Sequence, residues 1–388
     1  MERKKLLYIA FKDFSNLHFG ANAKVLSQCR AFSEYEYDVD LIGRSGHDTV
    51  LIHANGDTRV LRHYDESVKN KKLHNLLDKR HQISDTVRYL KDKRYDACYV
   101  RYDFSDPGFL KLLKGVRSIC PVTALELPTY PYEHENSIGV LNRVKMAIDR
   151  RYRKQLHRYI DFIVTFYDGY DHLFGIPVLV IPNGFDFSTM QLVKGDLPSD
   201  GIHIIAVSSM REWHGYERMI EGLHLYYQGG EKNKRNYILH LVGNGREYGK
   251  YARLATEYGL ERHIAMEGAM HGEALDALYE KCALGIDSLA RHRSGISVLS
   301  SLKSREYGAK GLPVINSCKI DILDEDFSYM LQVPADETPI DMNAVGAFYD
   351  QCFSHKSRLE VGMEIRSYIM NKAGMKETIY EIVRRFQI

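Results

Sequence analysis

The sequence has 388 residues, of which 44% are hydrophobic and 27% are charged, and its formal net charge is +2. These values are typical of a globular protein and exclude a disordered or fibrous chain. The length exceeds what one hydrophobic core usually supports, so we expect two domains. The small net charge gives no argument for nucleic-acid binding, and no stretch is apolar enough to span a bilayer.

The first half alternates short apolar runs with helical patterns. Residues 6–11 form the first apolar run, a polar loop carrying Gly20 follows, and a helical pattern covers 21–32. Further runs typical of strands lie at 38–43, 97–100, 122–127, 162–166 and 177–181. Strands that alternate with helices predict βαβ units and a parallel sheet. The charged start, Met1 to Lys5, is too soon interrupted for a signal peptide, which we do not expect.

The same alternation restarts after a linker at 195–201, rich in glycine and polar residues. Expected strands lie at 202–207, 238–242, 263–267, 284–287 and 313–316, and expected helices at 216–227, 246–258, 272–281 and 302–310, with a helical tail over 363–386. The predicted fold class is therefore α/β, with two Rossmann-like domains that face a cleft. The first domain covers 1–187 and the second 188–371, and a C-terminal helix at about 372–388 could pack back on the first. Open α/β sheets bind ligands beyond the carboxyl ends of their strands.

Two loops of the second half carry groups suited to an anion. The polar loop 208–215 follows an expected strand and opens a helix, where free N–H groups and the helix dipole favour negative charge. Gly243 and Gly245 follow the next strand, and glycine lets a ligand approach the backbone closely. Each signal alone is weak, because a glycine after a strand is usually part of a turn.

The most specific segment runs from 293 to 315, where a Ser/Gly-rich stretch leads into a helix and ends in Gly-Leu-Pro before a strand. Lys303 and Glu306 are three residues apart and share a helix face. A cation there can hold a diphosphate, and a carboxylate can accept hydrogen bonds from ribose hydroxyls. The alternative is a surface ion pair between these two side chains.

Four motifs in order resemble the C-terminal half of retaining glycosyltransferases of the GT-B fold, in particular glycosyltransferase family 4. They are Ile181 to Asp186 (I-P-N-G-F-D), the segment from Trp213 to Ile220, the turn Gly243-Asn244-Gly245, and the run from Glu306 to Val314. The resemblance covers roughly residues 180–320 well and the first half in outline.

The resemblance implies roles for particular residues. Glu306 holds the ribose, Lys303 faces the diphosphate, and Gly20 approaches the phosphates from the first domain. Gly243 belongs to the donor loop. The family's basic pair falls on Ser209 and His214, with Arg211 nearby, and His214 can still donate to a phosphate. The first glutamate of the family's E-x7-E pattern falls on Val298, so backbone N–H groups of Ile296 and Ser297 are expected to serve the sugar.

In the first half, residues 123–135 mix aromatic, carboxylate and imidazole groups that suit recognition of sugar hydroxyls. The histidine that the family often carries near here aligns with Leu127, and His134 is the substitute candidate. A structured turn without chemistry is the alternative. The catalytic candidates are thus Lys303, His214 and His134.

A basic amphipathic helix is expected over 141–159. Its apolar positions are Leu141, Val144, Ile148, Tyr152, Leu156 and Tyr159, and its basic residues are Arg143, Arg150, Arg151, Lys154 and Arg158. In one hypothesis, the apolar side of this helix packs into the first domain. In the other, its basic residues are attracted to anionic lipids of the inner leaflet.

The residues and the resemblance together predict a cytoplasmic hexosyltransferase, peripheral on the inner membrane face at most. It takes a nucleotide-sugar, UDP-sugar favoured over GDP-sugar, and transfers the sugar with retention to a glycan or lipid-linked glycan in polysaccharide assembly. We expect no metal, no further cofactor and no nucleic-acid partner. The six single cysteines are expected to be buried thiols. The alternatives are an epimerase or hydrolase of the same fold and a pseudo-transferase that binds a glycan or a protein.

Overall fold

The computed structural model describes residues 3–15, 20–53, 56–65, 71–130, 132, 140–166, 169–230 and 234–387. The chain divides into two compact units. Unit 1 contains Met1–Asp186 and Met375–Ile388, and unit 2 contains Phe187–Gly374. Each unit has its own sheet and its own hydrophobic core.

Unit 1 is built on a nine-stranded sheet with the order β4-β3-β2-β1-β5-β6-β7-β9-β8. The strands are β1 (Lys4–Asp13), β2 (Tyr37–Ser45), β3 (Asp48–His53), β4 (Thr58–Arg62), β5 (Ala97–Arg101), β6 (Thr123–Leu127), β7 (Phe162–Thr165), β8 (His172–Leu173) and β9 (Ile176–Val180). The strands from β2 to β9 in this order pair in parallel, as expected from the alternation of strands and helices. Strands β3 and β4 were not predicted from the sequence, and they extend the sheet as an antiparallel edge.

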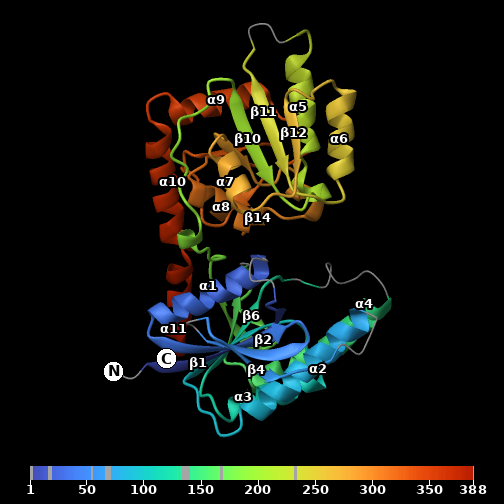
Figure 1. Ribbon diagram of the computed structural model, residues 1–388, viewed down its shortest axis with the longest axis vertical. Helices are drawn as coiled ribbons and strands as arrows, with labels where there is room; N and C mark the ends of the chain where they lie inside the picture. The colour runs from blue at the N-terminus through green and yellow to red at the C-terminus, as the bar shows by residue number, and fades with distance from the viewer. Residues whose placement is uncertain are drawn as a thin grey trace. The chain divides into compact units, whose positions relative to one another are not determined.

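Helices cover both faces of this sheet (Figure 1). They are α1 (Gly20–Glu34), α2 (Lys71–Tyr89), α3 (Pro107–Arg117), α4 (Val140–Tyr152) and α11 (Met375–Phe386). Alternate residues of β1 face opposite ways, because side chains alternate along a strand. Leu6 and Tyr8 pack with α1 and α11, whereas Leu7 and Ile9 pack with α2, α3 and α4. Both faces are therefore buried, which is typical of a doubly wound α/β sheet.

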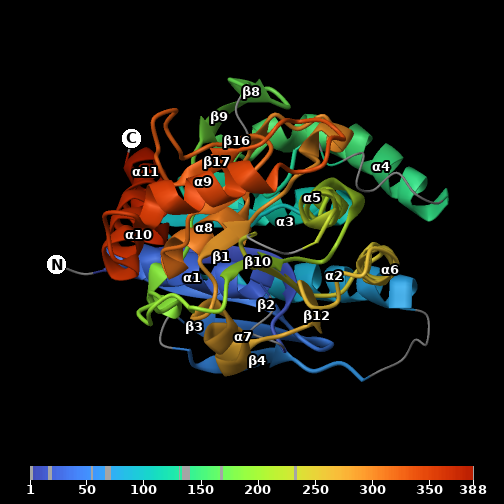
Figure 2. The same ribbon diagram turned by 90° about the horizontal axis from the view of Figure 1, so that it is seen from above.

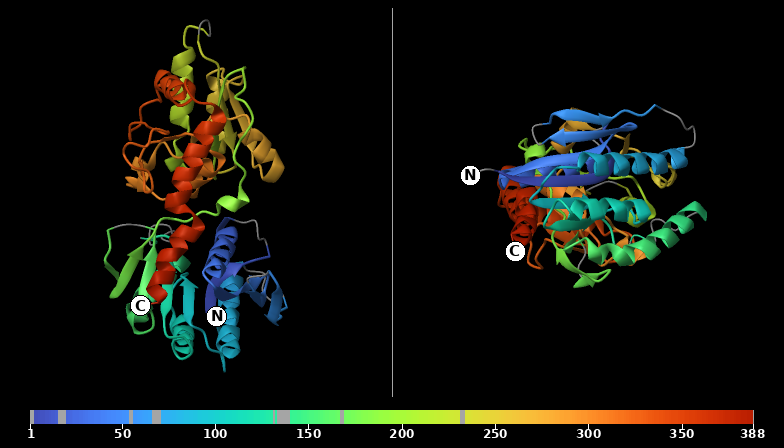
Figure 3. Two further views of the ribbon diagram at one scale, coloured as in Figure 1. Left: turned by 90° about the vertical axis from the view of Figure 1, so that its left-hand side faces the viewer. Right: turned by 90° about the horizontal axis from the view of Figure 1, so that it is seen from below.

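The last helix completes unit 1. Helix α11 lies beside α1, and Figure 3 shows it in red within this unit. The Met375 N–H donates a 2.8 Å hydrogen bond to the Phe185 carbonyl, inside the motif Ile181 to Asp186. In the same motif, Asp186 pairs with Arg30 of α1 at 2.7 Å. This motif directly follows β9, so its hydrogen bond and its ion pair connect α11 and α1 to the end of the sheet.

Unit 2 is built on a six-stranded parallel sheet with the order β12-β11-β10-β13-β15-β17. The strands are β10 (Ile202–Val207), β11 (Tyr237–Val242), β12 (Ile264–Gly268), β13 (Leu284–Ile286), β15 (Val314–Asn316) and β17 (Met330–Gln332), and a separate pair is formed by β14 (Val298–Leu299) and β16 (Lys319–Ile320). The helices are α5 (Glu217–Tyr227), α6 (Tyr248–Glu257), α7 (Gly272–Tyr279), α8 (Leu302–Lys310), α9 (Met342–Phe353) and α10 (Arg358–Ala373).

The faces of this second sheet are also covered. Helices α5, α6 and α9 share a core with Ile202, Ile204 and Ala206 of β10. Helix α8 covers the opposite face at Tyr307, whose hydroxyl donates to the Ile286 carbonyl at 2.9 Å. Helix α10 packs on α8, and α6 and α10 lie on opposite sides of the unit (Figure 2). The predicted α/β fold with two Rossmann-like units is confirmed.

Three expectations about helices need correction. The basic helix ends at Tyr152 and continues as a 3-10 segment, η1 (Arg153–Arg158), so it is not one helix to 159. Its apolar stripe packs into unit 1 only in its second half: Leu156 is buried and Tyr152 and Tyr159 pack against the core, whereas Val144 is 51% and Ile148 39% exposed. The charged tail is two helices, α10 and α11, with Gly374 between them.

All six cysteines are buried and unpaired, as the sequence predicted. In the described part of the chain, every helix is too short or too polar to cross a bilayer.

Candidate functional site

The carboxyl ends of β10, β11 and β13 place three loops of unit 2 against one another. Gly243, after β11, has a φ of +118°, and a Cβ there would lie 1.9 Å from the Ser208 carbonyl oxygen after β10. Gly215, at the end of the first loop, has a φ of +62°, and its Cβ would lie 2.5 Å from that of Ala290 after β13. Both positions require glycine because left-handed backbone and close approach exclude a side chain. The predicted donor loop 208–215 thus meets both the loop 243–245 and the chain that follows β13.

His214 is buried in this group of loops, with 4% of its surface exposed. The backbone N–H of Arg211 donates a 2.9 Å hydrogen bond to Nδ1 of His214. Burial lowers the pKa of His214 to about 2, with help from the charges of Lys303, Arg291 and Arg211. The ring is therefore neutral at ordinary pH, and since Nδ1 accepts, Nε2 carries the proton. His214 is thus an uncharged hydrogen-bond donor in a basic environment.

Lys303 lies at the start of α8, where its ammonium is held by the end of β13. Its Nζ lies 2.9 Å from Oδ1 of Asp287, 2.5 Å from the Asp287 carbonyl oxygen and 3.2 Å from Oγ of Ser288. Asp287 is fully buried and also accepts a hydrogen bond from Ser301, the N-cap of α8. The expected alternative, an ion pair between Lys303 and Glu306, is absent among the described residues because Lys303 pairs with Asp287 instead.

Glu306 lies on α8, and its side chain contacts the last residue of α7, Tyr279. The Tyr279 hydroxyl donates a 2.7 Å hydrogen bond to Oε1 of Glu306. Burial raises the pKa of Glu306, and the Tyr279 hydrogen bond and Lys310 offset part of that rise. The side chain is partly exposed, and Oε2 remains available to accept from a hydroxyl. This geometry is compatible with a carboxylate that accepts hydrogen bonds from a ribose.

The remaining residues that were predicted to bind the nucleotide-sugar lie in the same loops. Ser209 is exposed, and Arg211 is partly exposed beside His214. The Ile296 N–H, which we expected to serve the sugar, donates instead to the Arg291 carbonyl oxygen at 3.2 Å. The Ser297 carbonyl accepts from the Lys319 N–H, which joins β14 to β16.

Arg291, which lies in the loop after β13, was not predicted from the sequence. Its guanidinium carbon is 5.7 Å from the centre of the Trp213 ring, and its charge contributes to the low pKa of His214. No motif of the family pointed to this position. The only available signal was its place four residues after Asp287, at the end of a strand.

The candidates in unit 1 are less informative. Gly20 is the first residue of α1, and His134 lies outside the described residues. In the segment expected to recognise sugar hydroxyls, Glu126 is fully buried. Gln28 and Tyr99 donate to it at 2.6 and 2.8 Å, and Arg101 pairs with it. Glu126 therefore belongs to an internal network rather than to an open sugar site.

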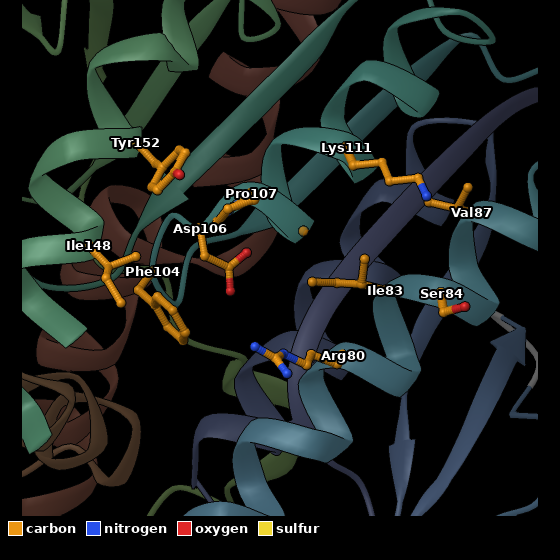
Figure 4. Close-up of a pocket in the computed structure, with 11 residues that line it drawn as sticks. Arg80, Ile83, Ser84, Val87, Phe104, Asp106, Pro107, Lys111, Ile148 and Tyr152 are labelled. Atoms are coloured by element: carbon orange, nitrogen blue, oxygen red, sulfur yellow. The ribbon is translucent and has the colours of Figure 1, made fainter. Parts of the chain in front are cut away.

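Unit 1 also contains a cavity of about 540 Å³ that includes none of the predicted site residues. Phe104, Ile148 and Tyr152 lie on one side of it and Ile83 and Val87 of α2 on the other, with Asp106 and Pro107 between them (Figure 4). Asp106 is the N-cap of α3, because its carboxylate accepts from the Phe109 N–H. The partly exposed Ile148 thus continues an apolar hollow that α4 shares with α2 and α3.

Several solved structures share this fold. Sucrose-phosphate synthase from Thermosynechococcus elongatus aligns with a TM-score of 0.63 at 14% identity, over 99% of this chain and 99% of its own. A glycosyltransferase from Rickettsia africae aligns with a TM-score of 0.62 at 11% identity, over 100% and 98%. HepE of Anabaena in complex with UDP aligns with a TM-score of 0.60 at 13% identity, over 99% of both chains. The chain therefore has the GT-B fold of glycosyltransferases.

Comparisons at the level of sequence gave no such match. No protein-family model matches this chain, and no curated protein matches it.

Proposed function

We propose that this chain transfers a hexose-type sugar from a nucleoside diphosphate sugar to a glycan or lipid-linked glycan. The observation that carries the proposal is the meeting of His214, Arg291 and the two glycine-bearing loops at the carboxyl ends of β10, β11 and β13. In an open α/β sheet this edge is where ligands bind. The presence of UDP in the HepE structure supports a UDP-sugar as the favoured donor.

Each part of the donor has a partner of matching chemistry in unit 2. Glu306 accepts hydrogen bonds from the ribose, since its Oε2 is not used by Tyr279. The loops at Ser209 and Gly243 line the path of the nucleotide, and His214 and the nearby cations receive the diphosphate. Ser297 and the chain before β14 lie next to the sugar. Val298 is 51% exposed, so the sugar meets an apolar side chain where the family has a carboxylate.

The reaction proceeds with retention and without a protein base. The bond between the anomeric carbon and the diphosphate oxygen breaks, and a bond from the acceptor oxygen to that carbon forms on the same face. The acceptor proton passes to the leaving diphosphate. The protein's contribution is to stabilise the charge that grows on this leaving group, which preorganised donors do most effectively in a site with little water. We propose that no metal is needed, and turnover that is unchanged by EDTA tests this.

A screen with nucleotide-sugars tests the proposal directly. Binding stabilises the folded state by mass action, so the matching donor raises the melting temperature. Product analysis with and without a glycan acceptor then separates the candidates. A transferase consumes the donor only with acceptor, whereas a hydrolase or epimerase converts it alone. A pseudo-transferase binds without converting the donor, and this outcome, like the absence of any donor binding, contradicts the proposal.

We also propose that α4 attaches the protein to an anionic membrane surface. Arg143, Arg150, Arg151, Lys154 and Arg158 are exposed. The acid within this stretch, Asp149, is fully buried, where Tyr132 and the Ser105 N–H donate to it at 2.6 and 2.7 Å. From 143 to 158 the exposed side therefore carries basic but no acidic side chains, and the exposed Val144 and Ile148 lie beside them. This combination is typical of helices that lie in the headgroup region.

A further inference from the structure

The charge of Lys303 is already matched inside unit 2. Burial alone would raise the pKa of Asp287, but Lys303 and the Ser301 hydroxyl outweigh it and hold this pKa below its usual value. Asp287 is thus an anion, and Lys303 is its counter-ion at 2.9 Å. An ammonium that neutralises a fully buried carboxylate adds little net charge for a second anion.

Arg291 is in the opposite situation. Its neighbours are paired, since Arg293 contacts Glu217 and Glu337, and His292 contacts Glu337. Within the described residues, the Arg291 guanidinium has no ion pair and its buried Nε has no hydrogen-bond partner. A buried guanidinium N–H without a partner is costly, because its hydration has been lost without replacement. In the part of the chain that the structure describes, no carboxylate neutralises the Arg291 guanidinium, so it can bind an anion.

The surroundings of Arg291 favour a multiply charged oxyanion. The Leu289 N–H donates a 2.8 Å hydrogen bond to the His214 carbonyl, and Arg291 lies over the ring of Trp213, so the loop after β13 lies against the loop that carries His214. The charges of Lys303, Arg291 and Arg211 all lower the pKa of His214. His214 is neutral and its Nδ1 is used by the Arg211 N–H, so its Nε2–H is a donor without charge. Trp213 faces the guanidinium, which limits the directions in which Arg291 can extend. A guanidinium and an N–H donor in one place suit phosphate oxygens.

We propose that Arg291 and His214 form the diphosphate-binding site of this chain, and that Lys303 supports it as the counter-ion of Asp287. The inference rests on the proposed function, and it replaces the expectation that Lys303 faces the diphosphate. In this arrangement Arg291 binds the phosphate oxygens directly. Lys303 is a positioning residue, because it holds the end of β13 from which Arg291 extends.

Calorimetry with UDP and with uridine tests the assignment, since the two ligands differ only in the diphosphate. We expect Arg291→Gln to weaken UDP binding by about tenfold or more, as loss of a charge-assisted hydrogen bond does. Uridine binding should stay unchanged. The control is Arg253→Gln, an exposed arginine on α6 that should alter neither affinity. Arg291→Lys should keep part of the UDP affinity, because the charge remains.

The outcomes separate this inference from the proposed function. If the wild type binds UDP and Arg291→Gln binds it equally well, Arg291 is not in the site, and the proposed function stands. If the variant loses UDP and uridine to the same degree, Arg291 acts on the fold of the site rather than on phosphate, and the inference fails. If the wild type binds no nucleoside diphosphate, both proposals fail. Circular dichroism confirms that each variant is folded.

Discussion

The backbone N–H of Arg211 donates a 2.9 Å hydrogen bond to Nδ1 of His214, three residues further along the same loop. This contact fixes the tautomer of the ring, because a nitrogen that accepts cannot also carry the proton. It also orients the ring, which stacks on Tyr216 with centroids 5.5 Å apart. The loop thereby presents Nε2–H as a fixed donor before any ligand arrives.

The buried neutral His214 should make stability depend on pH. Its pKa falls from 6.5 to about 2 on folding, so below pH 6.5 the unfolded chain binds a proton that the folded chain does not. Stability is therefore present above this pH and is lost as pH falls, by about 1.4 kcal/mol per pH unit from this group. Between pH 7 and 5 the wild type should lose about 2 kcal/mol more than His214→Asn. Urea unfolding at both pH values measures this difference.

The asparagine variant is a matched control, because its side-chain oxygen can still accept from the Arg211 N–H. It lacks the distal donor, so UDP affinity should drop while the loop keeps its shape. Equal pH dependence in the two proteins would show that the ring is not held neutral.

Lys303→Met should lower the free energy of unfolding by more than it weakens the free energy of UDP binding. The change leaves the fully buried Asp287 without its counter-ion, and breaking a buried pair typically costs about 3 kcal/mol or more. Chemical denaturation measures the loss. The control is Lys310→Met on the same helix, whose partner Asp276 is 59% exposed and can be hydrated instead. Adding Asp287→Asn to Lys303→Met should restore part of the stability; a further loss would contradict the pairing.

Glu306→Ala should weaken donor binding without unfolding unit 2. Hydrogen bonds to a charged group contribute about 1.5–3 kcal/mol, so we expect the dissociation constant to rise roughly ten- to a hundredfold. Calorimetry with UDP and uridine checks this, and here both ligands should be affected because both carry the ribose. Glu257→Ala, at an exposed position of α6, serves as the control. Unchanged uridine affinity in Glu306→Ala would remove this carboxylate from the site.

Replacing Arg150, Lys154 and Arg158 by glutamate should abolish binding to anionic vesicles. Each basic residue near such a surface contributes about 1 kcal/mol, and the attraction weakens with salt. Sedimentation with vesicles that contain phosphatidylglycerol measures binding, and vesicles of phosphatidylcholine alone give the baseline. A second triple variant, Lys4, Lys91 and Lys93 to glutamate, changes the charge equally at other exposed sites of unit 1. If both variants sediment like the wild type, α4 is not the attachment site.

The sequence identified α8 with its full bounds because local signals mark both ends. Ser301 caps the first turn through the Ser304 N–H, and Gly311 ends the helix with a φ of +76°. The partner of Lys303 could not be found in the same way. Asp287 is 16 residues earlier on another element, and a helical pattern shows only which residues share a face. The pairing therefore depends on how β13 and α8 pack, which the sequence does not display.

The basic helix shows how an apolar pattern can mislead. The spacing of Val144, Ile148 and Tyr152 predicts one buried stripe, yet only Tyr152 of these packs against the core, and the buried positions of α4 include Met146 and Asp149. Asp149 decides the orientation, because Tyr102 and Tyr132 from two other segments donate to its carboxylate. A buried polar network of this kind outweighs the burial of two aliphatic side chains. The alternation of strands and helices along the chain is a stronger signal of the fold than the apolar spacing within one helix, and it predicted both sheets.

Because α11 belongs to unit 1, that unit is assembled from both ends of the chain. During synthesis, all of unit 2 leaves the ribosome before the residues of α11 do. Throughout this interval, apolar side chains that α11 later covers, such as Phe32 and Phe162, are without their final partner Phe386. Unit 2 can therefore mature first, and a nascent chain that stalls within α10 presents an incomplete apolar face that chaperones recognise.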